Sequence, residues 1–397
     1  MTQQQVKNTI RPFHVNIPEE EIIELRRRIN ATRWPEKETV LDQSQGTQLS
    51  TMQELARYWA TDYDWRKIEK KLNALPHFIT EIDGLDIHFI HVRSKHENAM
   101  PLLVAHGWPG SIIEQMKPIE PLTNPTEYGG SASDAFHLVI PSMPGYGFSG
   151  KPTSTGWDPK RIAHAYGELM TRLGYTKYAA QGGDWGAIVV DFMGVQEVEG
   201  LIGIHTNMAA VIPPEVDAAI WSGNSLPSGL SDEEKKAAEQ VLENKFAYAS
   251  LMGTRPQTLT GLVDSPVGLA AFMLDHDWKS LALISRSFAG VKEGLTCDDV
   301  LDNITLFWLT NTAVSASRLY WENSVAGISF FGVKGVKLPV AVSVFPDELY
   351  EAPKSWTEKA YPNLIHYNRL PKGGHFAAWE QPEYLISELR TALKSLR

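Results

Sequence analysis

The stretch QGGDWG at residues 181–186 decides the fold that this sequence predicts. It follows an expected strand at residues 177–180 and precedes an apolar run at residues 187–193 that can open a helix. Glycines on both sides of Asp184 are typical of a nucleophile elbow, a tight strand-to-helix turn that presents one reactive side chain above a sheet. The usual elbow carries serine, whereas a carboxylate attacks carbon and forms an ester. The alternative interpretation is that Asp184 only caps the helix that follows.

Strands and helices alternate on both sides of this turn. Apolar runs at residues 102–105, 136–140 and 201–205 predict strands, and a helical pattern covers residues 158–173 between two of them. This order predicts the α/β class with a mostly parallel sheet. A G-x-G-x-x-G match at residues 145–150 does not indicate a dinucleotide site, because that motif must open a helix directly and the next helix begins later.

Residues 1–95 form the first of two units that we expect outside the core of the fold. Amphipathic helical patterns occur at residues 19–30, from residue 50, and at residues 64–75. Their apolar faces need a partner surface, so we expect this N-terminal extension to pack on the core and on the lid described next.

Residues 209–327 are mostly helical and predict a lid inserted between strands of the core. A capping box at Ser231 opens one helix that we expect to run to about residue 251. Ser265 and the proline after it start another helix, and residues 298–323 predict one or two more. The two parts of the core are then residues 96–208 and 328–397, and the second part ends in a helical pattern at residues 382–396.

Composition excludes several classes of protein. The 397 residues carry a formal net charge of −10 and no basic stripe, which argues against a nucleic-acid partner. The single Cys297 excludes a disulfide framework, and His88 and His91 would point to opposite faces of one strand, which disfavours a metal site there. No apolar run approaches 18 residues, and residues 1–5 lack the apolar core of a signal peptide. We therefore expect a soluble, cytoplasmic protein without a membrane anchor.

Three reactive groups follow one another in the order that the elbow fold requires, which is nucleophile, then acid, then histidine. Asp184 comes first. Asp347 and Glu348 follow an expected strand at residues 336–345, and His375 lies in a later Gly-Gly-His turn. Each group is expected where a loop leaves the carboxyl end of a strand, so the three side chains can meet at one edge of the sheet.

Five motifs, spread over nearly the whole chain, resemble those of epoxide hydrolases of the α/β-hydrolase superfamily, in particular the microsomal type and its soluble microbial relatives. RPF at residues 11–13 resembles the N-terminal signature of the family, and HGWPGS at residues 106–111 resembles its oxyanion loop. GGDWG at residues 182–186 resembles the family's nucleophile elbow, and SPVGLAA at residues 265–271 resembles a segment of its lid. GGHFAA at residues 373–378 resembles the motif that carries its catalytic histidine.

The resemblance implies an α/β-hydrolase fold with a helical lid and an N-terminal helical extension, and it implies a role for each site residue. These are Asp184 as nucleophile, His375 as base, Glu348 as the charge partner of His375, Tyr320 and Tyr248 as ring-opening acids, and the backbone N–H groups of Trp108 and Trp185 as the oxyanion hole. Glu348 is preferred to Asp347 because the family holds its acid two positions after a Phe-Pro pair. No metal or cofactor is implied.

Competing interpretations remain open at this stage. A haloalkane dehalogenase shares the aspartate and the histidine, and a non-catalytic ligand-binding member of the fold would show a broken triad. The expected partners are a small apolar epoxide and water, since Trp108, Trp185, Trp278 and Phe376 suggest an apolar pocket, with core packing as the alternative for Trp278. The oligomeric state is open, with a homodimer among the options.

Overall fold

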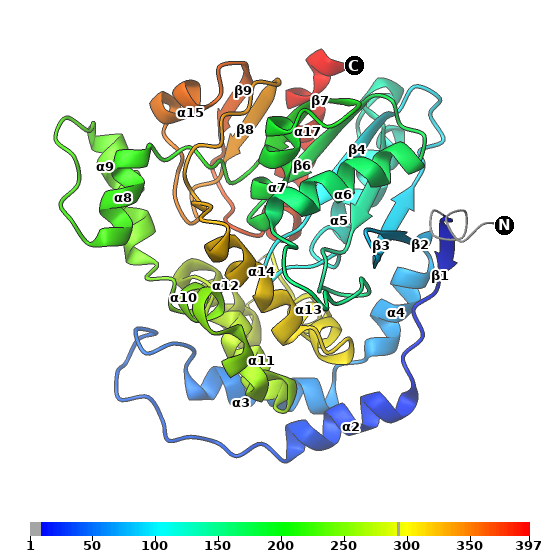
Figure 1. Ribbon diagram of the computed structural model, residues 1–397. Helices are drawn as coiled ribbons and strands as arrows, with labels where there is room; N and C mark the ends of the chain where they lie inside the picture. Colours follow the sequence, from blue (N-terminus) through cyan, green and yellow to red (C-terminus); the bar gives the residue numbers. More distant parts are fainter. Residues whose placement is uncertain (1–8, 292–293) are drawn as a thin grey trace.

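The computed structural model describes residues 9–291 and 294–397, so residues 1–5, on which the expectation of no signal peptide rests, lie outside the described part. The described strands form one sheet in the order β1-β2-β3-β5-β4-β6-β7-β8-β9 (Figure 1). Pairing is antiparallel from β1 to β5 and parallel from β5 through β4 to β9. The strands are β1 (Arg11–Phe13), β2 (His77–Ile82), β3 (Leu85–Val92), β4 (Met100–Ala105), β5 (Phe136–Pro141), β6 (Tyr178–Gly182), β7 (Leu201–Thr206), β8 (Val340–Val344) and β9 (Leu364–Arg369).

Helices cover both faces of the sheet. In one group, α6 (Pro159–Arg172) packs against α7 (Trp185–Val195). In the other, α5 (Met116–Thr123), α16 (Ala377–Glu380) and α17 (Pro382–Ala392) pack against one another. α15 (Lys354–Ala360) lies beside β9. All five residues of β6 are buried, as expected for a parallel strand with helices on both faces. The faces of β6 are therefore closed to ligands, and the elbow lies at its carboxyl end.

The lid connects β7 to β8 and lies across this carboxyl edge (Figure 1). Its helices are α8 (Pro214–Ser222), α9 (Asp232–Glu243), α10 (Ala247–Thr254), η3 (Pro256–Val263), α11 (Pro266–Leu274), α12 (Trp278–Phe288), α13 (Cys297–Leu309) and α14 (Ala313–Val325). The capping box at Ser231 and the serine cap at Ser265 are both formed.

Two sequence-based expectations were wrong about where elements end. The helix expected from Ser231 to residue 251 is broken, because Lys245 and Phe246 adopt left-handed backbone angles with φ of 56° and 43°. Asn244 supports the break by donating hydrogen bonds to the carbonyls of Gln240 and Leu349. The strand expected at residues 336–345 comprises only Val340–Val344, since the proline at position 339 has no N–H for the sheet ladder.

The N-terminal helices pack on the lid, and β1 joins the sheet through β2. α2 (Glu19–Asn30) contacts α11, α3 (Leu49–Thr61) contacts α11, α12 and α13, and α4 (Trp65–Asn73) contacts α13. Figure 1 shows α2 and α3 beneath the lid, on the side away from the sheet. The indole Nε1 of Trp59 donates a hydrogen bond of 2.9 Å to Thr305, and the hydroxyl of Tyr63 donates one of 2.9 Å to Asp302. The boundaries at residues 95, 208 and 327 remain predictions.

No helix in residues 9–291 and 294–397 combines the length and the apolar character that a membrane span needs.

Candidate active site

Asp184 occupies a strained turn between β6 and α7. Its backbone angles are φ 51° and ψ −129°, a conformation that non-glycine residues rarely adopt and that is found at functional sites. The turn closes because its neighbours lack side chains. A Cβ atom on Gly182 would lie 2.2 Å from the backbone of Gly186, and one on Gly186 would lie 2.0 Å from the carbonyl oxygen of Ala105. The two glycines thus permit the approach of strand and helix that raises Asp184 above the sheet.

The carboxylate of Asp184 is buried and contacts two groups. Its Oδ1 accepts a 2.7 Å hydrogen bond from the backbone N–H of Trp108, and its Oδ2 lies 3.5 Å from Nε2 of His375. Burial alone would raise the pKa of Asp184, but the hydrogen bond and charge of His375, together with the Trp108 amide, hold that pKa below its usual value. Asp184 is therefore ionised at neutral pH. Trp185 opens α7, and the first amides of a helix have no partner within it.

The loop that carries Trp108 is attached to the lid. Asn303 on α13 donates a hydrogen bond of 2.8 Å to the carbonyl of Pro109 and accepts one of 2.7 Å from the hydroxyl of Ser111. Both hydrogen bonds are buried. The role of Asn303 was not predicted from sequence, because no motif identifies a residue that links two distant segments by hydrogen bonds.

His375 lies beside Asp184 with its other ring nitrogen bound to an acid. Its Nδ1 lies 2.5 Å from Oε1 of Glu348, and both side chains are 2% exposed. Glu348 also accepts a hydrogen bond of 2.7 Å from the backbone N–H of Leu349, which orients the carboxylate. Burial alone would lower the pKa of His375, yet the charges and hydrogen bonds of Glu348 and Asp184 raise it well above its usual value.

Asp347 lies apart from this pair. Its side chain is 59% exposed, and within the described part of the chain its one ion pair is with the ammonium of Lys279, at 3.7 Å. The backbone of Asp347 has a structural role, because its N–H donates to the carbonyl of Gly373 and so ties the loop after β8 to the turn that carries His375. The structure thus brings Glu348, rather than Asp347, to the histidine.

Two lid tyrosines face the elbow. Tyr248 lies in the first turn of α10, just after the break at Lys245 and Phe246, and its ring stacks on Trp108 with centroids 4.8 Å apart. The ring of Tyr320 on α14 contacts Trp185 edge to face at 4.8 Å and lies 6.1 Å from the ring of Tyr248. Burial raises the pKa of both phenols well above 10, so both stay protonated at neutral pH.

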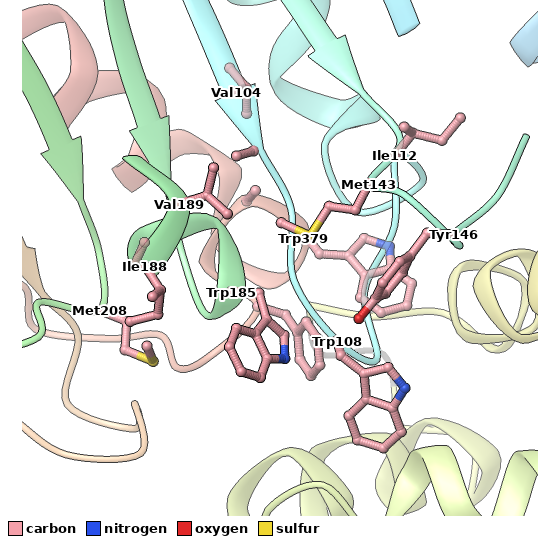
Figure 2. Close-up of a cluster of buried hydrophobic side chains, with 14 of the residues drawn as sticks. Val104, Trp108, Ile112, Met143, Tyr146, Trp185, Ile188, Val189, Met208 and Trp379 are labelled. Carbon is pink, nitrogen blue, oxygen red and sulfur yellow. The ribbon is translucent and has the colours of Figure 1, made fainter. Parts of the chain in front are cut away.

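Asp184, Tyr248 and Tyr320 line one cavity of about 510 Å³. Aromatic side chains form much of its wall, namely Trp185, Trp221, Phe246, Phe330 and Phe331. The lining also includes three exposed lid residues, Lys245, Ser250 and Ser324. Figure 2 shows Trp108 and Trp185 where the buried apolar cluster meets the lid helices.

Trp278 does not belong to this cavity. It begins α12 and is 56% exposed, with the ammonium of Lys279 5.8 Å from the centre of its ring. Both interpretations from sequence, a pocket residue or a core residue, were wrong, because the Trp278 side chain lies on the solvent side of α12, while Ser280 and Leu281 of the same turn are buried. Phe376, by contrast, is 7% exposed and contacts the ring of His375 edge to face.

Two buried ionisable residues near Asp184 were missed by the sequence analysis. His276 lies in the connection between α11 and α12, with its ring centroid 4.3 Å from that of His375. Glu114 follows the HGWPGS loop and lines a small cavity that also touches Asp184 and His375, and burial raises its pKa to about 8. Within the described residues, the one group of side chains that can hold a metal is Asp184, His276 and His375, and none of the histidines at positions 77, 88, 91 and 96 contributes to it.

The sheet order, the elbow and the lid define an α/β hydrolase, here one with a carboxylate where most members carry serine. Family models agree, since "Epoxide hydrolase N terminus" matches residues 10–115 and "alpha/beta hydrolase fold" matches residues 100–245. A protein of Stigmatella aurantiaca that carries an epoxide hydrolase name is 48% identical over 394 residues, which cover 98% of this chain and 86% of that protein. Epoxide hydrolase 1 of Oryctolagus cuniculus is 35% identical, with 96% of this chain and 88% of that protein covered.

Solved structures lead to the same family. The juvenile hormone epoxide hydrolase of Bombyx mori superposes with a TM-score of 0.85 at 30% identity, over 100% of this chain and 96% of that chain. The Aspergillus niger epoxide hydrolase superposes with a TM-score of 0.80 at 28% identity, over 99% of this chain and 98% of that chain. The chain therefore belongs to the epoxide hydrolases, as an enzyme of the α/β-hydrolase fold, and the family and fold predicted from the motifs are confirmed.

Proposed function

We propose that the enzyme converts an apolar epoxide to a vicinal diol through a covalent ester on Asp184. The observation that carries this proposal is the position of the Asp184 carboxylate, which has two protonated tyrosines across the cavity on one side and the His375–Glu348 pair on the other. The tyrosines can assist opening of the epoxide ring, and the His375–Glu348 pair can activate water to hydrolyse the ester. The names of the relatives support the choice of epoxide as substrate class.

In the first step, a carboxylate oxygen of Asp184 attacks one ring carbon of the epoxide, and the bond between that carbon and the ring oxygen breaks. The leaving oxygen becomes a strongly basic alkoxide, which takes a proton from Tyr248 or Tyr320. Both phenols remain protonated at neutral pH because burial raises their pKa. The need for these oxygen-directed acids separates the proposal from dehalogenation, since a halide leaves without a proton.

Ester formation itself prepares the second step. While Asp184 is ionised, its charge and that of Glu348 hold the pKa of His375 high and keep the ring protonated. The ester carries no charge, so the pKa of His375 falls once Asp184 is alkylated. The ring then releases its Nε2 proton to solvent and can act as a base while Glu348 still holds its Nδ1. It takes a proton back from solvent once the Asp184 carboxylate has been restored.

In the second step, His375 removes a proton from water, and the resulting hydroxide attacks the carbonyl carbon of the ester. The N–H groups of Trp108 and Trp185 stabilise the oxyanion, each by about 3 kcal/mol on the scale of other oxyanion holes. Collapse breaks the bond between the Asp184 carbonyl carbon and the diol oxygen, which takes the proton from His375. The remaining proton of the water restores the tyrosine, so the balance is one epoxide and one water to one diol.

The substrate class follows from the cavity. A volume of about 510 Å³ with aromatic walls suits an apolar epoxide of moderate size, because such surfaces favour ligands that leave few polar groups unpaired. Wall residues such as Phe246 and Phe330 are expected to select among epoxides by shape, while Asp184 and the tyrosines act on the ring common to all of them.

A single turnover in water enriched in ¹⁸O, with enzyme in excess over styrene oxide, tests the proposal. The diol of the first turnover should contain no heavy oxygen, because both of its oxygens come from the epoxide and from Asp184. The peptide that contains Asp184 should then gain heavy oxygen, measurable by mass spectrometry, and Asp184→Asn should show neither turnover nor label. Heavy oxygen in the diol of the first turnover would show direct attack by water and would refute the covalent route.

A further inference from the structure

His276 is a second buried histidine whose ring nitrogen is free to bind a ligand beside Asp184. Its side chain is 2% exposed, and its ring lies against that of His375 at a tilt of 33°, with centroids 4.3 Å apart. Its Nδ1 lies 3.0 Å from Oδ2 of Asp277, while its Nε2 is buried without a hydrogen-bond partner. An unpaired buried ring nitrogen costs free energy, and the proposed reaction does not use it.

Both histidines are held in the same way. Glu348 binds Nδ1 of His375 and Asp277 binds Nδ1 of His276, so in each ring a carboxylate holds a proton on Nδ1 and leaves Nε2 as the ligand atom. His375 has to release its Nε2 proton when the ion binds. Histidine ligands of zinc usually have this carboxylate on the far nitrogen, which sets the tautomer and the ring orientation. Asp277 is itself fixed, because its Oδ1 accepts a hydrogen bond of 2.8 Å from the backbone N–H of Ser280.

A carboxylate completes the donor set. One ligand atom each from Asp184, His276 and His375 lie within 4.8 Å of one another, and the distance from Oδ2 of Asp184 to Nε2 of His375 is 3.5 Å. Two ligands of a tetrahedral zinc ion, each about 2.0 Å from the metal, are roughly 3.3 Å apart. Asp184 and His375 already have nearly this separation, and His276 has to move closer to complete the site. Two imidazoles and one carboxylate suit Zn²⁺ or Co²⁺ and suit the oxygen-seeking Mg²⁺ and Ca²⁺ poorly.

We propose that Asp184, His276 and His375 form a binding site for one divalent transition-metal ion of the Zn²⁺ type, and that the bound ion inhibits the enzyme reversibly. Three protein ligands leave a fourth position of a tetrahedral ion for water. Binding of the ion does not depend on the proposed reaction. Inhibition does, because the ion occupies the oxygen that would attack the epoxide and the nitrogen that would activate water.

Co²⁺ is a suitable probe, since its visible absorption bands are intense in a four-coordinate site and weak when the ion is bound by water and surface groups. Titration of the metal-free 397-residue chain should give intense bands that saturate at one ion per chain and that disappear when Zn²⁺ or EDTA is added. His276→Gln should weaken Co²⁺ binding at least about 100-fold, because one of three ligands is lost. His164→Gln, which removes an exposed histidine, is the matched control and should bind like the parent protein.

Asp277→Asn provides an independent test if His276→Gln proves unstable by circular dichroism. Asparagine can still accept the hydrogen bond of Ser280, but it no longer supplies the charge that orients His276, so we expect binding about 10- to 100-fold weaker. Intense Co²⁺ bands that are the same in His276→Gln and the parent chain, or no stoichiometric binding at all, would overturn the site. Stoichiometric binding that leaves epoxide turnover unchanged would overturn the inhibition and would also contradict the assigned roles of Asp184 and His375.

Discussion

Nδ1 of His375 lies 2.5 Å from Oε1 of Glu348, a carboxylate with the same low exposure as the histidine ring. The adjacent Asp347 is mostly exposed and makes only a long contact with Lys279. Two neighbouring acids on one loop therefore have unequal environments, and a single pair of variants can separate their roles.

Glu348→Gln is expected to slow hydrolysis of the ester on the order of 10²-fold or more, because the imidazolium loses its counter-charge and the ring loses control of its tautomer. Formation of the ester should change much less. Asp347→Asn is the matched control and should leave both steps within about twofold. Stopped-flow fluorescence of the active-site tryptophans can measure the two steps separately. A larger effect from Asp347→Asn than from Glu348→Gln would reverse the assignment.

His375→Gln is expected to form the ester and then fail to hydrolyse it, because glutamine cannot remove a proton from water. Mass spectrometry of the intact protein after incubation with an epoxide should show one added substrate mass, located on the peptide that contains Asp184. The double variant His375→Gln with Asp184→Asn should show no adduct. Continued turnover by His375→Gln at the parent rate would exclude His375 as the base.

Tyr248→Phe and Tyr320→Phe are each expected to slow ring opening about 10²-fold, since each removes one acid from the leaving oxygen. The double variant should be nearly inactive in the alkylation step. Tyr146→Phe is a suitable control, because Tyr146 is fully buried and has no place in the cavity. Alkylation by the double variant at the parent rate would show that the lid tyrosines only pack against Trp108 and Trp185.

Asp302→Asn tests the contact between the N-terminal extension and the lid. Burial, with help from neighbouring acids, raises the pKa of Asp302 to about 7, against 3.8 for an exposed aspartate. The folded state therefore holds one more proton than the unfolded state between about pH 4 and pH 7, so this group makes stability fall as pH rises through that window and changes little above it. One pKa unit corresponds to about 1.4 kcal/mol, so the loss is at most about 4 kcal/mol.

Asparagine at position 302 can still accept the hydrogen bond from Tyr63 but never ionises. The variant should thus be more stable than the parent at pH 8, by about 1–3 kcal/mol after allowance for solvent screening, and the difference should shrink toward pH 5. Urea unfolding at several pH values measures this difference. Glu243→Gln, at an exposed position, should show no such trend. A difference between Asp302→Asn and the parent that does not change with pH would contradict the raised pKa.

Much of the fold was predictable because its signals are local. The helix expected at residues 19–30 is observed with the same bounds, and most strands are within two residues of their expected ends. Alternation of strands and helices, a capping serine before a helix and glycines around Asp184 all act through neighbours in sequence. The proposed reactive residues were predictable for a related reason, since the order of Asp184, Glu348 and His375 along the chain reflects the order of the strands that carry them.

The lid was less predictable, because its details depend on contacts between distant segments. Nothing local in the sequence breaks the helix after Glu243, and the break is supported by a hydrogen bond from Asn244 to Leu349, which is 105 residues away. That break sets the direction of Tyr248. Periodicity reports which face of a helix is apolar, but it does not report which partner covers that face, so Trp278 was expected inside and lies outside.

The sequence by itself determined the α/β fold, the elbow at Asp184 and the family, because these depend on short-range sterics and on motifs that are contiguous in the chain. Only the tertiary structure decided that the ring of His276 lies against that of His375, and that Asn303 on the lid holds the loop of Trp108. Each of these relationships joins residues on different segments. The distances between these residues depend on how the helices pack on the edge of the sheet. Many residues contribute to the free energy of that packing, so no single motif predicts it.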